Sequence, residues 1–124
     1  MVRVLSLGLV LTLAGIGGAS AAGDPVNGEK IFKRCQACHV INQEQNRVGP
    51  YLHGVVGRHA GMATGFNYSP AMKAHDVVWD DAELDKYLAD PKGSVPGNKM
   101  AFPGLKKPEE RADVIAYLKQ ASAQ

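Results

Sequence analysis

Apolar residues recur at the three- to four-residue spacing of a helix face in two stretches of the second half of the chain. These positions are Leu84, Tyr87, Leu88, Val114, Ile115, Tyr117 and Leu118. Asp80, with Glu83 three residues later, has the signature of a capping box at the start of the first stretch. Pro91 ends that helix, and Pro108 begins the last one, because proline is favoured in a first helical turn. The pattern therefore predicts two amphipathic helices.

Two further start signals combine a capping residue with a first-turn proline. Asp24 before Pro25 predicts a helix over residues 25–38, and a serine before a proline predicts a short helix over residues 70–75. Gly28 lies inside the first of these helices, where glycine costs about 1 kcal/mol relative to alanine. This cost suggests that another helix approaches the backbone closely at that position.

The segments between the helices, residues 40–63 and 91–103, have neither a helical nor a strand period. They are rich in glycine and proline. Long loops of this kind in a small domain usually have a function, such as enclosing a bound group. With no strand pattern and no internal repeat, the sequence predicts an all-α domain with long loops that wrap a cofactor.

The first residues have the features of an export signal. A short basic start is followed by an apolar run and by small residues ending in Ser20-Ala21-Ala22. The run is shorter than the roughly 20 apolar residues that a membrane span requires. We therefore expect residues 1–22 to be a signal peptide and residues 23–124 to form one domain in the periplasm, without stable membrane insertion.

The densest chemical signal is Cys35-Gln36-Ala37-Cys38-His39, a C-x-x-C-H motif typical of covalent attachment of c-type haem. The two thiols can each form a thioether with a haem vinyl group, and the histidine can bind the iron. The alternatives are a structural disulfide, a redox-active cysteine pair or half of a zinc site. Zinc normally requires four protein ligands, and the sequence has no second cysteine pair.

The length and the charge balance of the chain are consistent with a protein that binds a cofactor. A mature chain of roughly 100 residues has a small core of its own, and a haem would supply much of what is missing. The sequence has 14 Lys and Arg against 12 Asp and Glu. This balance argues against a nucleic-acid-binding protein.

Several residues could provide the second iron ligand: Met62, Met72, Met100, His53, His59 and His75. Met100 follows a Pro-Gly turn far along the chain from His39, which suits a ligand that approaches the opposite haem face. A thioether opposite an imidazole favours Fe(II) and raises the reduction potential. The spacing favours Met100, and a second histidine ligand is the main alternative.

Beyond this motif, the sequence resembles class I cytochromes c, close to the bacterial cytochrome c2 and mitochondrial cytochrome c group. The resemblance lies in the C-x-x-C-H motif and in Gly28-Glu29-Lys30-Ile31-Phe32, Gly49-Pro50-Tyr51-Leu52-His53-Gly54, Gly57-Arg58, Gly65-Phe66-Asn67-Tyr68, Trp79, Tyr87-Leu88, Asp90-Pro91-Lys92, Pro96-Gly97-Asn98-Lys99-Met100-Ala101-Phe102 and Glu110-Arg111-Ala112-Asp113-Val114-Ile115-Ala116-Tyr117-Leu118. These segments span nearly the whole domain in order.

The resemblance implies that His39 and Met100 are the axial ligands of one haem c and that Cys35 and Cys38 are its thioether anchors. It also implies that the Pro50 carbonyl accepts a hydrogen bond from the His39 ring. The first and last helices would cross at the costly glycine.

The remaining wall of the haem site is implied in the same way. Tyr87 and Asn98 would donate hydrogen bonds towards the methionine sulfur, and Arg58, Tyr68 and Trp79 would face the haem propionates. Without the resemblance, Trp79 and Tyr87 would be interpreted as core aromatics and Arg58 as a surface charge.

Two filled axial positions leave no place for a substrate, so we expect a one-electron carrier rather than an enzyme. It would shuttle between a membrane cytochrome complex or periplasmic dehydrogenase and an oxidase, reductase or reaction centre. The fold of the family would place a basic ring around the haem edge, suited to redox partners with acidic docking faces: Lys33, Arg34, Arg47, Lys92, Lys99, Lys106 and Lys107. We expect a monomer. The alternatives are a ligand-binding haem enzyme or sensor, and a detached domain that serves one larger enzyme.

Overall fold

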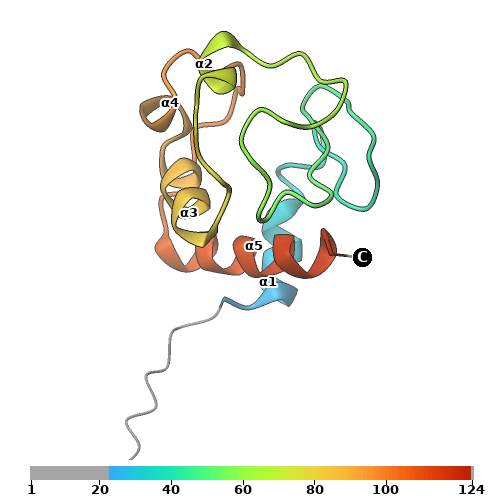
Figure 1. Ribbon diagram of the computed structural model, residues 1–124. Coiled ribbons are helices and arrows are strands. Elements are labelled where there is room, and N and C mark those ends of the chain that lie inside the picture. Colours follow the sequence, from blue (N-terminus) through green and yellow to red (C-terminus); the bar gives the residue numbers. More distant parts are fainter. Residues whose placement is uncertain (1–22, 124) are drawn as a thin grey trace, which may run out of the picture.

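The computed structural model describes residues 23–123, in which short helices are joined by long loops (Figure 1). The helices are α1 (Pro25–Phe32), α2 (Pro70–Lys73), α3 (Asp81–Ala89), α4 (Pro91–Ser94) and α5 (Pro108–Ala121). The β pairing found within residues 23–123 is one isolated antiparallel bridge between His59 and Val78. The prediction of an all-α fold is confirmed. The predicted signal peptide lies outside the described residues.

The helices begin where the capping residues predict. Asp24, Ser69 and Asp80 each accept a hydrogen bond from a backbone amide in the first turn of the helix that follows. The capping box at Asp80 is formed in one direction only, because the backbone amide of Asp80 donates to the Val78 carbonyl. Thus Glu83 contributes its amide to the cap rather than its carboxylate.

The first helix is shorter than predicted, because α1 ends at Phe32 rather than near residue 38. The amides of Lys33, Arg34 and Cys35 each bind the carbonyl three residues earlier, the pattern of a tightened 3₁₀-type turn. The amide of His39 then binds the Cys35 carbonyl at 2.9 Å. The C-x-x-C-H motif is therefore a compact turn at the end of the helix, not a part of it.

The segment after Pro91 also differs from the prediction of an irregular loop. The Asp90 carboxylate accepts a hydrogen bond from the Gly93 amide at 3.0 Å and caps α4, a single helical turn. The Asp90-Pro91 pair thus ends α3 and starts α4. A Cβ atom at Gly93 would meet the Asp90 carboxylate, which would have to shift to make room for it.

Helices α1 and α5 pack against each other and close one side of the molecule (Figure 1). Gly28 is buried at their contact, where a Cβ atom would collide with the Asp113 carbonyl and lie 2.8 Å from the Tyr117 Cβ. The two carboxylate oxygens of Asp113 accept from the Asp24 amide and the Asn27 side chain, each at 2.7 Å. The close helix approach predicted from Gly28 is confirmed.

The glycine-rich loop is held in place by a neutral side chain. The Oδ1 atom of Asn46 accepts from the Tyr51 amide at 3.0 Å, and its Nδ2 donates to the Thr64 carbonyl at 2.9 Å. The Tyr51 hydroxyl in turn accepts from the Thr64 amide at 3.1 Å. These bonds join two irregular segments into one wall without a helix or a strand.

An ion pair on the surface makes this wall sensitive to pH. The His59 Nε2 lies 2.7 Å from the Asp76 carboxylate, and its Nδ1 lies 3.0 Å from the Ala60 carbonyl, so the doubly protonated ring can donate to both. These hydrogen bonds raise the pKa of His59 above its ordinary value of 6.5. The pair therefore stabilises the fold fully below that ordinary value, and its contribution is lost as the pH rises through the raised pKa.

Replacing Asp76 with asparagine is expected to lower the His59 pKa, because the carboxylate that favours the imidazolium is removed. The pKa is measured by an NMR titration of the His59 ring in the haem-bound protein. Asp81→Asn is a matched control, since Asp81 pairs with Lys119 instead. An unchanged His59 pKa in the Asp76 variant would contradict the assigned cause.

Candidate functional site

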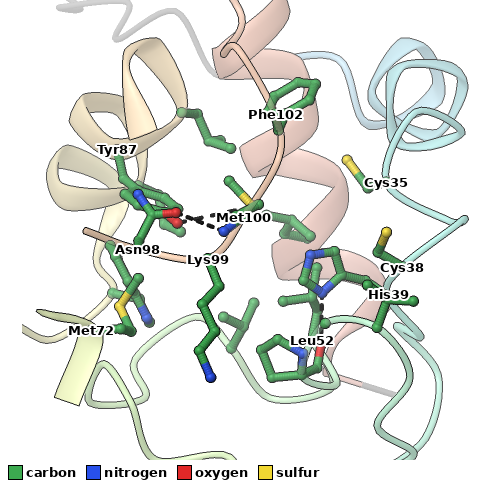
Figure 2. A pocket seen from close by; sticks show the side chains of 18 of the residues that line it. Cys35, Cys38, His39, Leu52, Met72, Tyr87, Asn98, Lys99, Met100 and Phe102 are labelled. Carbon is green, nitrogen blue, oxygen red and sulfur yellow. Dashed lines mark hydrogen bonds between the residues drawn. The ribbon is translucent and has the colours of Figure 1, made fainter. Parts of the chain in front are cut away.

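The helices and loops enclose a cavity of about 300 Å³. Side chains from α1, α2, α3 and α5 line it, together with both irregular segments, and most of them are apolar or aromatic. Among the lining residues are both cysteines, His39 and Met100, which come from two distant parts of the chain (Figure 2). The fold therefore brings the residues proposed for haem attachment and for iron binding to one cavity.

The cysteine turn presents its two sulfurs to this cavity. In the described chain Cys35 and Cys38 form no disulfide, and no cluster of three or more metal-binding side chains occurs. Burial raises the pKa of the Cys35 thiol, and the nearby Arg34 partly opposes this effect.

The His39 ring is oriented by a backbone carbonyl. Its Nδ1 lies 2.7 Å from the Pro50 oxygen, and a carbonyl can only accept, so Nδ1 carries the proton. Burial lowers the pKa of His39, which favours the neutral ring and leaves the Nε2 lone pair free. Gly49 lies against the ring, and a Cβ atom there would collide with it. The sequence around Pro50 thus fixes both the tautomer and the position of the ring.

Met100 enters the same cavity from the loop after α4. The Tyr87 hydroxyl on α3 donates to the Met100 sulfur at 3.9 Å, a long contact of the kind that sulfur accepts weakly (Figure 2). Burial raises the pKa of Tyr87 to about 12, so the hydroxyl keeps its proton at neutral pH. Both residues line the cavity, so the contact lies on the cavity side of the loop.

The expectation that Asn98 also donates to this sulfur is wrong. Both donor contacts of its amide nitrogen go to backbone carbonyls, those of Pro91 and Val95, each at 2.9 Å. Its oxygen accepts from the Met100 amide at 2.8 Å. Asn98 therefore contacts the backbone of Met100, while the sulfur contact is left to Tyr87.

The three residues expected near the propionates all line the cavity. Arg58 donates to the Tyr51 and His53 carbonyls, while its buried Nε has no partner within the described residues. The Tyr68 hydroxyl accepts from the Ala63 amide at 2.9 Å and keeps its own hydrogen to donate. Trp79 is buried at the same wall. A buried donor of a cationic group that has no partner is costly in isolation, and a bound carboxylate would offset that cost.

The other candidate ligands of the iron differ in whether they line the cavity. Met62 is 64% exposed and does not line the cavity, nor do His53, His59 and His75. Met72 is buried and does line it, so position alone leaves two methionines. The hydrogen bond from Tyr87 distinguishes Met100 from Met72.

Sequence reasoning missed part of the apolar wall. Leu52, Phe66 and Phe102 lie in irregular segments and line the cavity. An isolated apolar residue in a loop has no period that would mark it as buried. The one available signal was that large apolar residues in glycine-rich loops need a surface to pack against.

This set of groups fits a c-type haem. Two thiols lie beside a neutral imidazole, a thioether enters from another segment, and an unpaired guanidinium nitrogen is available for a propionate. Imidazole and thioether are the pair of ligands that cytochromes c offer to iron. The largely apolar walls suit a macrocycle and exclude water.

Comparisons with known proteins agree with this assignment. Residues 25–122 match the family model for cytochrome c. Cytochrome c2 of Rhodomicrobium vannielii is 56% identical over 101 residues, which are 81% of this chain and 81% of that protein. Cytochrome c of Chlamydomonas reinhardtii is 56% identical over 104 residues, 82% of this chain and 93% of that one.

A solved structure supports the same family assignment. Cytochrome cH from Methylobacterium extorquens matches with a TM-score of 0.76 and 52% sequence identity, covering 79% of this chain and 99% of that chain. The family match extends over nearly all the described residues, and the similarity holds in both sequence and structure. The chain therefore belongs to the cytochrome c family of electron carriers and holds one covalently attached haem c.

Proposed function

We propose that this protein is a periplasmic one-electron carrier in which His39 and Met100 are the axial ligands of the haem iron. One observation carries most of the proposal. A neutral imidazole with a free Nε2 and a thioether held by the Tyr87 hydroxyl line the same cavity. In this proposal Cys35 and Cys38 anchor the haem.

The haem would supply a metal centre that gains and loses one electron without making or breaking a bond to substrate. The residues of the chain would then only need to hold the two ligand side chains in place and keep water away from the haem. Pro50 holds the His39 ring in one tautomer, Tyr87 holds the Met100 sulfur, and the apolar wall excludes water. His39 and Met100 would both be held as ligands to the haem iron and would leave no site for a substrate, so we propose a carrier rather than an enzyme.

The charged surface suits acidic redox partners. Each basic residue of the expected ring is exposed, namely Lys33, Arg34, Arg47, Lys92, Lys99, Lys106 and Lys107. Arg34 and Lys99 also line the cavity, and Arg34 has a distant partner in Glu110 at 3.8 Å. Exposed cations of this kind speed association with a negative face and make it sensitive to salt.

The proposed location rests on the predicted signal peptide and on bacterial relatives such as the cytochrome c2 named above. Among residues 23–123, none of the helices combines the length and hydropathy needed to span a membrane. We propose that the protein works as a monomer between a membrane cytochrome complex or dehydrogenase and a terminal acceptor.

The deciding experiment is the visible spectrum of the haem-bound protein, oxidised and reduced, with and without carbon monoxide. We expect a weak far-red band in the oxidised protein, sharp bands on reduction and no response to carbon monoxide. Immediate binding of carbon monoxide and no far-red band would contradict ligation by Met100. That outcome would instead support a ligand-binding enzyme or sensor.

A further inference from the structure

We propose that Asn98 is a positioning residue for the iron ligand: its side chain ties the backbone of Met100 to helix α4 and so keeps the sulfur directed into the cavity. The inference rests on the proposed role of Met100 as an axial ligand. It replaces the expected contact between Asn98 and the sulfur by a contact with the peptide backbone beside it.

The carboxamide of Asn98 makes hydrogen bonds to three backbone groups. Its Nδ2 donates to the carbonyls of Pro91 and Val95, each at 2.9 Å, and its Oδ1 accepts from the Met100 amide at 2.8 Å. These partners also decide the orientation of the amide, because a carbonyl cannot donate and an N–H cannot accept. One side chain therefore connects the start and end of α4 to the ligand residue.

Helix α4 gives Asn98 a fixed support. Pro91 is among the most deeply buried side chains, and Val95 is only 3% exposed. Helix α4 also packs against α3, the helix that carries Tyr87. A bond from Asn98 to the buried residues of this turn therefore fixes Met100 relative to α3. The Ser94 hydroxyl donates to the Lys86 carbonyl at 3.0 Å in an exposed hydrogen bond that lies apart from the contacts of Asn98.

The chain between α4 and Met100 needs such a tie. Gly97 adopts a left-handed conformation, with φ of 90°, and it is exposed, as is Lys99. Lys99 contributes one hydrogen bond, from its ammonium group to the Asn67 carbonyl at 3.2 Å. Beyond the buried Val95, little apolar burial holds residues 96–99, and the three bonds of Asn98 are their densest set of contacts.

Other side chains cannot reproduce this set. Serine and threonine have one hydroxyl hydrogen and cannot donate to both carbonyls. Aspartate can accept from the Met100 amide, but it would place an anionic oxygen beside two carbonyl oxygens. Alanine removes all three bonds. Substitutions at this one position therefore remove different numbers of the three hydrogen bonds.

The test compares the haem-bound wild type with Asn98→Ala, Asn98→Ser and the control Ser94→Ala, using imidazole as a competing ligand. Ser94→Ala removes a hydrogen bond of α4 that does not reach Met100. Three quantities are measured: the far-red band, the affinity of the oxidised protein for imidazole, and hydrogen exchange of the Met100 amide by NMR.

We expect Asn98→Ala to bind imidazole about tenfold more tightly, because several hydrogen bonds that favour the closed loop are lost. The Met100 amide should exchange about tenfold faster or more, since its acceptor is removed. Asn98→Ser should have an intermediate effect on both, and it provides the test if the alanine variant does not fold. Ser94→Ala should leave the Met100 amide exchange within about twofold of the wild type.

The proposal is overturned if the Asn98 variants match the wild type in imidazole affinity and amide exchange. It is also overturned if Ser94→Ala produces the same changes, because the effect would then be general loosening of the loop. A wild type without the far-red band would refute Met100 ligation itself. The Met100 amide exchange would still decide whether Asn98 fixes the backbone.

Discussion

Replacing Met100 with alanine is expected to lower the reduction potential by on the order of 0.2 V, a part of the ~0.8 V range that axial ligands span. The thioether stabilises Fe(II) relative to Fe(III), and alanine cannot replace it. The vacated position should also bind carbon monoxide in the reduced protein. Tyr87 would lose its sulfur acceptor, so its hydroxyl would face the emptied side of the cavity.

The potential is measured by a spectroscopic redox titration of the purified haem-bound variant. Met72→Ala is the matched control, because Met72 is also buried and also lines the cavity. Its loss should lower stability while leaving the far-red band and most of the potential unchanged. If Met72→Ala abolishes the band and Met100→Ala does not, the assignment of the ligand is wrong.

Replacing Gly28 with valine is expected to destabilise the haem-bound protein by about 3 kcal/mol, at the upper end of the usual cost of overpacking. The new side chain would collide with the Asp113 backbone and push α1 away from α5. The same movement would disturb the bonds from Asp24 and Asn27 to the Asp113 carboxylate. The gain in helix propensity over glycine is below about 1 kcal/mol and cannot offset this cost.

The measurement is unfolding by guanidinium chloride, followed by circular dichroism in the far ultraviolet. Glu29→Val controls for the effect of a β-branched residue in α1, because Glu29 is exposed beside Gly28. Equal losses of stability in the two variants would show that the close contact at Gly28 contributes nothing special.

Much of the fold could be predicted because its signals are local. Asp24, Ser69 and Asp80 cap the helices that their side chains predict, and a period of apolar residues marks α5. Helix α4 was missed for a physical reason. A single turn is too short to show a period, and its Asp90-Pro91 signal was already accounted for as the end of α3.

Only those residues of the candidate site that belong to the C-x-x-C-H motif, or to the segments that resemble class I cytochromes c, could be predicted from the sequence. The C-x-x-C-H motif is contiguous, so Cys35 and Cys38 could be proposed as haem anchors from the sequence alone. The partners of Asn98 could not, because the Pro91 and Val95 carbonyls reach it only after α4 has turned. Backbone carbonyls are present at every residue, and their use by a side chain leaves no trace in the sequence.

The packing of α1 on α5 also has a consequence for the order in which the chain is made. The Asp24 amide and the Asp113 carboxylate that binds it are 89 positions apart. During synthesis α1 emerges first and has no surface to dock on until nearly all of the domain has been translated. Contacts between distant residues close large loops and form late. Until α5 has docked, the cysteines next to α1 are therefore expected to stay accessible for haem attachment.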